Sequence, residues 1–200
     1  MRLFAALIPP EEALDELAEA LAPVRASWPG LRWLSRGLWH VTLAFYGELD
    51  EEALQRLLPG LEQAARGHAL DLSLAGAGAF PRGSARSRVV WAGVEGELRA
   101  LAELAEAAVA AGEAAGARQD PHRDYHAHLT VARSRVPRDL SRLTGHLSGF
   151  AGAPWTAGEL HLVRSHHGTP RYESLERLPL GRPKAPRSEG PARTNAPRSE

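Results

Sequence analysis

The 200-residue sequence contains no cysteine, which excludes disulfide bonds and metal sites built on thiolate ligands. A chain without cysteine suits a reducing compartment, so we expect a cytoplasmic protein. There is also no run of about 18 consecutive apolar residues, which excludes a helical membrane span. The 24 basic side chains balance the 24 acidic ones, and the net charge is zero. This balance argues against broad, sequence-independent binding of nucleic acid, but it leaves room for a locally basic cleft.

The amino-acid composition changes along the chain and divides it into two parts. Hydrophobic residues make up 44% of the sequence and charged residues 24%, which suits a globular protein. From Gly181 onward the chain consists mainly of Pro, Arg, Ser, Glu and Gly, and the unit Ala-Pro-Arg-Ser-Glu occurs twice. Such a segment has too few apolar side chains to build a core. We therefore expect one folded domain over residues 1–180 and a disordered tail over 181–200.

Two short segments repeat the same pattern of side chains. His40 and Thr42 are separated by one valine, and His128 and Thr130 are separated by one leucine. Residues i and i+2 of a strand point to the same face, so each segment places an imidazole beside a hydroxyl. Two such strands facing one cleft would supply an acid, a base and two donors for an anionic oxygen.

The elements predicted after each of these strands also repeat, as one helix followed by two strands. Internal repeats bear on the choice of fold and are weighed first. We expect an α+β fold with two pseudo-symmetric lobes, each a mostly antiparallel sheet with outer helices, around a central cleft. The predicted helices are 11–27, 50–65, 96–115 and a short stretch after Pro137; the predicted strands are 2–8, 38–46, 70–74, 88–94, 159–164 and 171–178.

At these residues the chain resembles the two-histidine (2H) phosphoesterases, and within them the RNA 2′,3′-cyclic phosphodiesterases, formerly named 2′-5′ RNA ligases. That family carries two His-hydrophobic-Thr-hydrophobic motifs, and the second is usually followed by Ala-Arg, as at Ala132-Arg133 here. The sequence departs from the family at Ala127, where proline is common, and at the additional His126. The resemblance covers about residues 1–180 and extends to the segments 2–6, 80–81, 88–91, 162–165 and 171–173.

The resemblance implies hydrolysis of a 2′,3′-cyclic phosphate at an RNA end to a 2′-phosphomonoester, without metal or cofactor. The resemblance also implies that His40 is the proton donor to the departing 3′ oxygen and that His128 is the proton acceptor that activates water. Thr42 and Thr130 would hold the phosphate oxygens. The expected partners are RNA ends or small cyclic nucleotides, with no membrane, and a monomer is expected. Three further residues are candidate substrate contacts: Arg133, Phe80 and Tyr125.

Several alternatives stay open at the level of the sequence. The protein could be a 2H esterase for another cyclic nucleotide or for ADP-ribose cyclic phosphate, or a non-catalytic protein that binds RNA ends. His126 beside His128 leaves a zinc or iron site open, although no HExxH pattern is present. The same segment partly resembles the motif of histidine-triad nucleotide hydrolases, with Thr130 in place of the third histidine. That second family does not explain His40.

Overall fold

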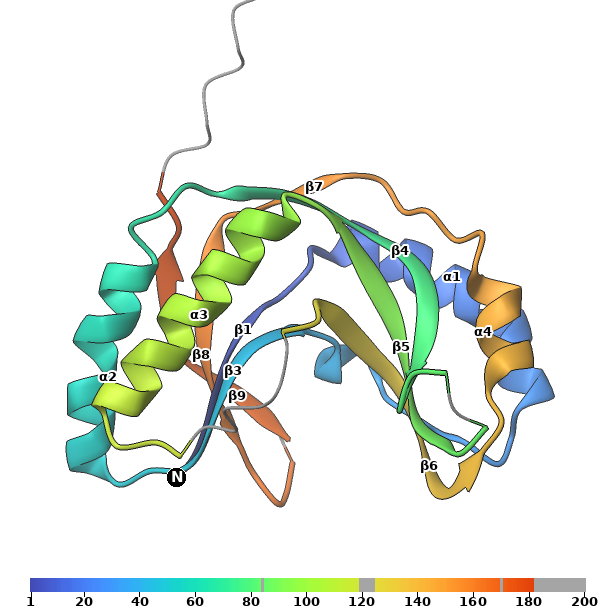
Figure 1. Ribbon diagram of the computed structural model, residues 1–200, viewed down its shortest axis with the longest axis horizontal. Helices are drawn as coiled ribbons and strands as arrows, with labels where there is room; N and C mark the ends of the chain where they lie inside the picture. Colours follow the sequence, from blue (N-terminus) through green and yellow to red (C-terminus); the bar gives the residue numbers. More distant parts are fainter. Residues whose placement is uncertain (84, 119–124, 170, 182–200) are drawn as a thin grey trace, which may run out of the picture.

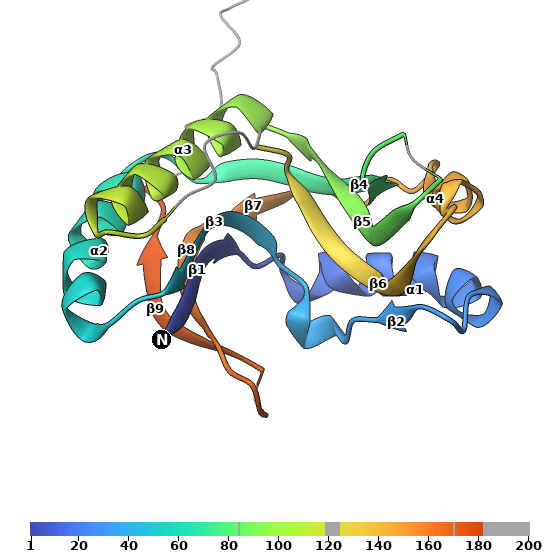
Figure 2. The same cartoon turned by 60° about the horizontal axis from the view of Figure 1, so that its bottom comes forward.

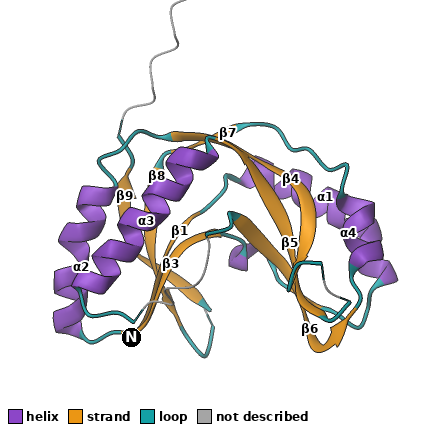
Figure 3. Cartoon of the chain, in the orientation of Figure 1, coloured by secondary structure: helices purple, strands orange, loops and turns teal. Residues whose placement is uncertain are grey.

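The computed structural model describes residues 1–83, 85–118, 125–169 and 171–181. It shows an α+β fold in which one curved sheet carries helices on its outer face (Figures 1 and 3). The strands follow the order β7-β4-β5-β6-β3-β1-β8-β9, and β2 pairs with β6. The elements are β1 Arg2–Leu7, α1 Glu11–Ser27, β2 Arg32–Trp33, the short 3₁₀ helix Arg36–Leu38, β3 Val41–Glu48, α2 Glu51–Ala64, β4 Leu70–Phe80, β5 Ser87–Gly96, α3 Leu98–Ala114, β6 His128–Arg138, α4 Ser141–Leu147, β7 Trp155–Ala157, β8 Glu159–Ser165 and β9 Tyr172–Pro179.

The two strands with the repeated motif lie side by side at the centre of the sheet. Val41 of β3 is the register partner of Leu129 of β6 in an antiparallel pair. On one side of this pair lie β1, β8 and β9 with α2 and α3, which we name the β3 lobe. On the other side lie β5, β4 and β7 with α1 and α4, which we name the β6 lobe (Figure 2). The predicted α+β architecture of two lobes is therefore confirmed.

The repeat in the sequence does not coincide with the lobes in space. The hairpin β4–β5 follows β3 in the chain, but β5 pairs with β6. The hairpin β8–β9 follows β6, but β8 pairs with β1, which in turn pairs with β3. Each motif strand is thus extended by the hairpin that follows the other one, and the two halves of the chain interlock across the centre of the sheet.

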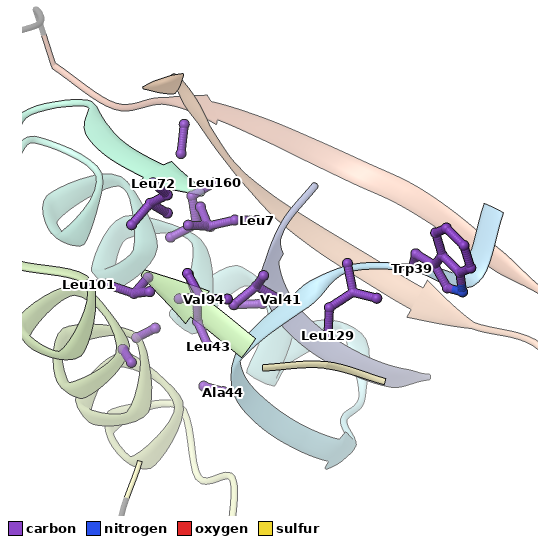
Figure 4. Packing of buried hydrophobic residues seen from close by; sticks show 14 of the residues in the cluster. Leu7, Trp39, Val41, Leu43, Ala44, Leu72, Val94, Leu101, Leu129 and Leu160 are labelled. Carbon is purple, nitrogen blue, oxygen red and sulfur yellow. The ribbon is translucent and has the colours of Figure 1, made fainter. Parts of the chain in front are cut away.

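The main core lies between the convex face of the sheet and the helices (Figure 4). Val41, Leu43 and Leu129 point into it and are almost fully buried. Because strand side chains alternate, the neighbours of these residues point to the concave face. The same alternation occurs in β1, where Leu3 belongs to the main core while Phe4 joins a small separate cluster on the other side of the sheet. The hydrophobic pattern thereby determines which side chains face the concavity.

Element boundaries differ from the sequence predictions by a few residues, with identifiable causes. The predicted helix 50–65 begins at Glu51 because Asp50 is its N-cap and accepts a hydrogen bond from the Ala53 amide at 2.8 Å. The predicted strand 38–46 begins only at Val41, because the preceding residues form a 3₁₀ turn. The predicted strand 70–74 continues to Phe80 through a run of alanine and glycine, which has no strand-like hydrophobic pattern.

No helix among the described residues is long and apolar enough to cross a membrane. At the end of the described chain, Gly181 forms an isolated β-bridge with His68. The rest of the predicted tail, residues 182–200, lies outside the described residues.

Candidate active site

The register between β3 and β6 brings the two repeated motifs onto one surface. Because Val41 and Leu129 are partners and both face the core, the residues on either side of them share the concave face. Continuing the antiparallel register by one residue places His40 across from Thr130 and Thr42 across from His128. The two histidines are therefore diagonal neighbours, which are typically about 7–8 Å apart, with a somewhat shorter distance between their Cβ atoms. A phosphate-sized group between them could contact both rings.

Both imidazoles are held by the same kind of backbone contact. Nδ1 of His40 lies 2.9 Å from the carbonyl oxygen of Leu38, and Nδ1 of His128 lies 2.7 Å from the carbonyl oxygen of His126. Since a carbonyl only accepts, each Nδ1 carries hydrogen and donates it. In both rings this leaves Nε2 as the nitrogen for proton exchange. The equivalence of these two contacts gives the site a local two-fold character.

The surroundings of His40 are aromatic. Its ring centroid lies 4.8 Å from that of Phe4 and 5.3 Å from that of Tyr172. Burial lowers the pKa of His40 to about 4, because the charged imidazolium loses hydration. The positive charges of His128 and Arg133 lower this pKa further, while the hydrogen bond to Leu38 acts in the opposite direction. At neutral pH the ligand-free protein therefore holds His40 in its neutral form.

The surroundings of His128 are also aromatic but come from the β6 lobe. Its ring centroid lies 5.0 Å from Phe80, 6.3 Å from Trp91 and 5.9 Å from His126, which is stacked on it at 18°. His126 in turn packs against Trp91 at 4.6 Å. Burial, and then the charge of Arg82, lowers the pKa of His126. His126 is thus packed as an aromatic neighbour of His128.

The other residues predicted to contact substrate differ in how far they are buried. Phe80 lies against the His128 ring, and Arg133 is exposed yet close enough for its charge to act on His40. Tyr125 has a buried hydroxyl without a hydrogen-bond partner among the described residues, and burial raises its pKa. Thr42 and Thr130 are half-buried.

The sequence predicts no role for Phe4 or Tyr172, the two rings that contact His40. The signal for Phe4 is present in the alternation of the first strand, where its neighbours face the core. No such signal exists for Tyr172, because β9 reaches the site only through its pairing with β8.

The metal alternative can be examined for the described part of the chain. There, no group of three or more His, Asp or Glu side chains is placed to hold a metal ion. Nε2 of His126 is buried and lacks a partner among the same residues. Another histidine near this segment in the sequence, His122, lies outside the described residues.

Comparison with known proteins identifies the relatives of this chain. A family model described as the 2′-5′ RNA ligase superfamily matches residues 13–169. An RNA 2′,3′-cyclic phosphodiesterase from Thermus thermophilus is 34% identical over 90% of this chain and 100% of its own length. Another, from Methanothermobacter thermautotrophicus, is 30% identical over 88% of this chain and 97% of its own length.

Solved structures agree with this comparison. The crystal structure of the Thermus thermophilus protein TT0787 matches with a TM-score of 0.73 and 30% identity, covering 90% of this chain and 98% of that one. E. coli LigT complexed with 3′-AMP matches with a TM-score of 0.70 and 28% identity, covering 90% and 97%.

Proposed function

The chain belongs to the 2′-5′ RNA ligase superfamily, and on that premise we propose that it hydrolyses 2′,3′-cyclic phosphates at RNA ends. Relatives that match most of its length carry the name RNA 2′,3′-cyclic phosphodiesterase. The observation that carries the proposal is the pair of imidazoles on one concave surface, each fixed through Nδ1 to a backbone carbonyl. Two such groups can donate and accept a proton on opposite sides of one phosphorus atom.

The proposed reaction breaks one bond of the strained five-membered ring. A water oxygen attacks phosphorus while Nε2 of His128 accepts the proton that the water loses. The bond from phosphorus to the 3′ oxygen breaks, and Nε2 of His40 donates a proton to that oxygen. The product is a 2′-phosphomonoester, and the two histidines exchange protonation states, which solvent then restores. Acid–base catalysis by positioned groups suffices for this step, and the proposal includes no metal.

The low pKa of His40 fits its role as donor once substrate is bound. In the free protein, burial and two nearby positive groups disfavour a proton on this ring. A bound phosphate anion between the rings reverses the sign of the local field and raises the pKa of His40. The proton is thus taken up with the substrate. The hydroxyls of Thr42 and Thr130, together with Arg133, would stabilise the charge that builds on the non-bridging oxygens.

The direct test is product analysis with a nucleoside 2′,3′-cyclic monophosphate in the presence of EDTA. We expect turnover to the 2′-monophosphate, unaffected by the chelator. Loss of activity with EDTA and recovery with zinc would support the metal alternative instead. Tight binding without turnover would support the non-catalytic alternative.

The two histidine roles can be separated with a substrate whose 3′ bridging oxygen is replaced by sulfur. A thiolate leaves without being protonated, so this substrate does not need a general acid. We expect it to restore most activity to His40→Ala and little to His128→Ala. The reverse result would exchange the two roles while leaving the reaction unchanged.

A further inference from the structure

The turn that precedes His40 carries the carbonyl that orients its ring. Residues Arg36–Leu38 form a 3₁₀ helix, in which two backbone amides donate to the carbonyls three residues earlier. The carbonyl oxygen of Leu38 lies 2.9 Å from Nδ1 of His40. This contact keeps hydrogen on Nδ1 and leaves Nε2 for the proton that the proposed reaction transfers. A movement of the turn would therefore move the proposed proton donor.

The backbone of this turn is held firmly at one end only. Trp39, which follows the turn, is 4% exposed and belongs to the main core. A single 3₁₀ turn has poorer hydrogen-bond geometry than an α-helix. Gly37 in its middle is exposed and adds conformational freedom. The start of the turn therefore depends on contacts made by side chains.

The side chain of Arg36 ties the start of the turn to α1. One guanidinium nitrogen donates to a carboxylate oxygen of Asp15. The other donates to the carboxylate of Glu11 at 2.5 Å and to the backbone carbonyl of Glu11 at 2.6 Å. The helix that carries these acceptors is fixed in turn, because Leu14 and Leu17 are buried in the main core. Arg36 thus connects the mobile end of the turn to a rigid element.

The geometry of this tether is more informative than its strength. An ion pair between exposed side chains adds little to the free energy of unfolding. A planar guanidinium that binds several acceptors in fixed directions does, however, restrict where its own backbone can lie. The contacts of Arg36 therefore point to a role in placing the turn rather than in stabilising the fold.

We propose that Arg36 is a positioning residue for His40: it holds the 3₁₀ turn against α1, and the turn directs Nε2 of His40 toward the departing 3′ oxygen. This inference rests on the proposed function and adds a residue to it. Arg36 acts through Leu38 and His40. A displacement of about 1 Å is enough to lower the rate of a positioned reaction on the order of 10²-fold.

The other histidine of the pair does not depend on this tether. Nδ1 of His128 donates to the carbonyl of His126, and the ring of His126 packs against Phe80 and Trp91. The carbonyl that orients His128 is thus supported by aromatic packing in the β6 lobe. Loss of Arg36 should therefore impair the proposed acid and spare the proposed base.

The test uses the substrate with sulfur at the 3′ bridging position, because its thiolate leaves without a general acid. Arg36→Ala is compared with Arg99→Ala, a matched control in which the lost guanidinium pairs with Glu103 on the exposed face of α3. For Arg36→Ala we expect kcat/KM with the oxygen substrate to fall roughly 10-fold, and with the sulfur substrate by about 2-fold or less. A change in substrate binding acts on both substrates and cancels in their ratio. Arg99→Ala should match the wild type with both.

A second variant removes a partner of Arg36 without changing the turn itself. Asp15→Asn keeps the size of the side chain and replaces a charged acceptor with a neutral one, which weakens the hydrogen bond. We expect the same selective loss with the oxygen substrate, smaller than for Arg36→Ala. Circular dichroism on each variant confirms that the fold is intact.

Three results would overturn the inference: equal losses with the two substrates, no loss with the oxygen substrate, or the same selective loss in Arg99→Ala. If the wild-type protein hydrolyses neither substrate, the proposed function fails, and nitrogen NMR of histidine-labelled protein decides the tether by itself. The His40 signal is assigned from its absence in His40→Asn. A change from the Nδ1–H tautomer to a mixture in Arg36→Ala, with none in Arg99→Ala, supports the tether, and an unchanged tautomer refutes it.

Discussion

Among the single residues of the site, the two histidines are alike in their backbone contacts and different in their surroundings. Each donates through Nδ1 to the carbonyl of the residue two positions earlier. His40 then packs against Phe4 and Tyr172, whereas His128 packs against Phe80. A nearly symmetric pair thereby acquires unequal environments, as an acid and a base require.

The proposed catalytic residues should differ in how much activity their removal costs. His40→Ala and His128→Ala should each lower kcat roughly 10²- to 10⁴-fold, the usual contribution of a general acid or base. Thr42→Ala or Thr130→Ala should lower kcat less than the histidine substitutions do, because one neutral donor is lost while its counterpart remains. Steady-state kinetics with circular dichroism as a fold control would show this. A larger loss for the threonines would assign the main chemistry to them.

Burial of His40 should also make stability depend on pH. Its pKa is about 4 in the folded protein and about 6.5 in the unfolded chain, so below pH 6.5 the unfolded chain binds more protons. The neutral, buried His40 therefore adds to the free energy of unfolding above pH 6.5, and this added stability is lost as the pH falls toward 4. Urea titrations measure this effect. From pH 7 to pH 5, the free energy of unfolding of the wild type should fall by about 1–2 kcal/mol more than that of His40→Asn, whose side chain does not titrate. Parallel losses in the two proteins would contradict a buried neutral His40.

Among the secondary-structure elements, the β4–β5 hairpin fixes the aromatic surroundings of His128. Gly78 of β4 is the register partner of Trp91 of β5, and a Cβ at position 78 would overlap the indole ring. Trp91 in turn contacts His126 and His128. The absence of a side chain at Gly78 therefore allows the indole to lie across the hairpin and pack against the His128 ring.

Gly78→Ala should disturb this arrangement. The overlap forces Trp91 to move, at a cost of about 1–3 kcal/mol in unfolding free energy. Displacement of Trp91 also loosens the packing of His128, so kcat should fall several-fold. Gly149→Ala is the matched control, because a Cβ there meets open space. Urea titration, tryptophan fluorescence and kinetics on both variants check this, and equal behaviour of the two would refute the role given to Gly78.

In the molecule as a whole, two interlocked lobes meet at the β3–β6 pair. The chain passes between the lobes several times, so neither lobe is a continuous segment. At the last described residue, the Gly181 amide donates to the Gly67 carbonyl at 2.6 Å and the Gly181 carbonyl accepts from the Ala69 amide at 2.9 Å. Gly181 therefore contacts the folded domain, although it lies beyond the predicted boundary at 180.

Two truncations should separate this contact from the rest of the C-terminal segment. Removal of residues 182–200 should leave the melting temperature and the turnover of a short substrate nearly unchanged, because their composition offers almost no apolar surface to bury. Removal of 181–200 also deletes the two backbone hydrogen bonds of Gly181 and should lower the melting temperature by a few degrees. A clear loss of stability in the shorter truncation would show that the tail packs on the domain.

Features that depend on local periodicity could be predicted from the amino-acid sequence. Alternation along two strands placed each histidine beside its threonine and opposite the core residues, and the structure confirms that pattern for Val41 and Leu129. Apolar spacing located the three long helices to within two residues, and Asp50 marked one helix start. These predictions succeed because backbone geometry repeats every 2 or about 3.6 residues, within a window that a sequence displays directly.

Features that depend on strand pairing across the chain required the folded structure. Pairing joined each hairpin to the other motif's lobe, brought Tyr172 against His40 and buried that ring enough to lower its pKa. It also formed the pocket beside His40, which Phe4, Tyr172 and Ser174 line. A strand's sequence shows which face is apolar but not which strand lies beside it, because backbone hydrogen bonds are the same for every partner. Partners are selected by the packing of the whole sheet against its helices.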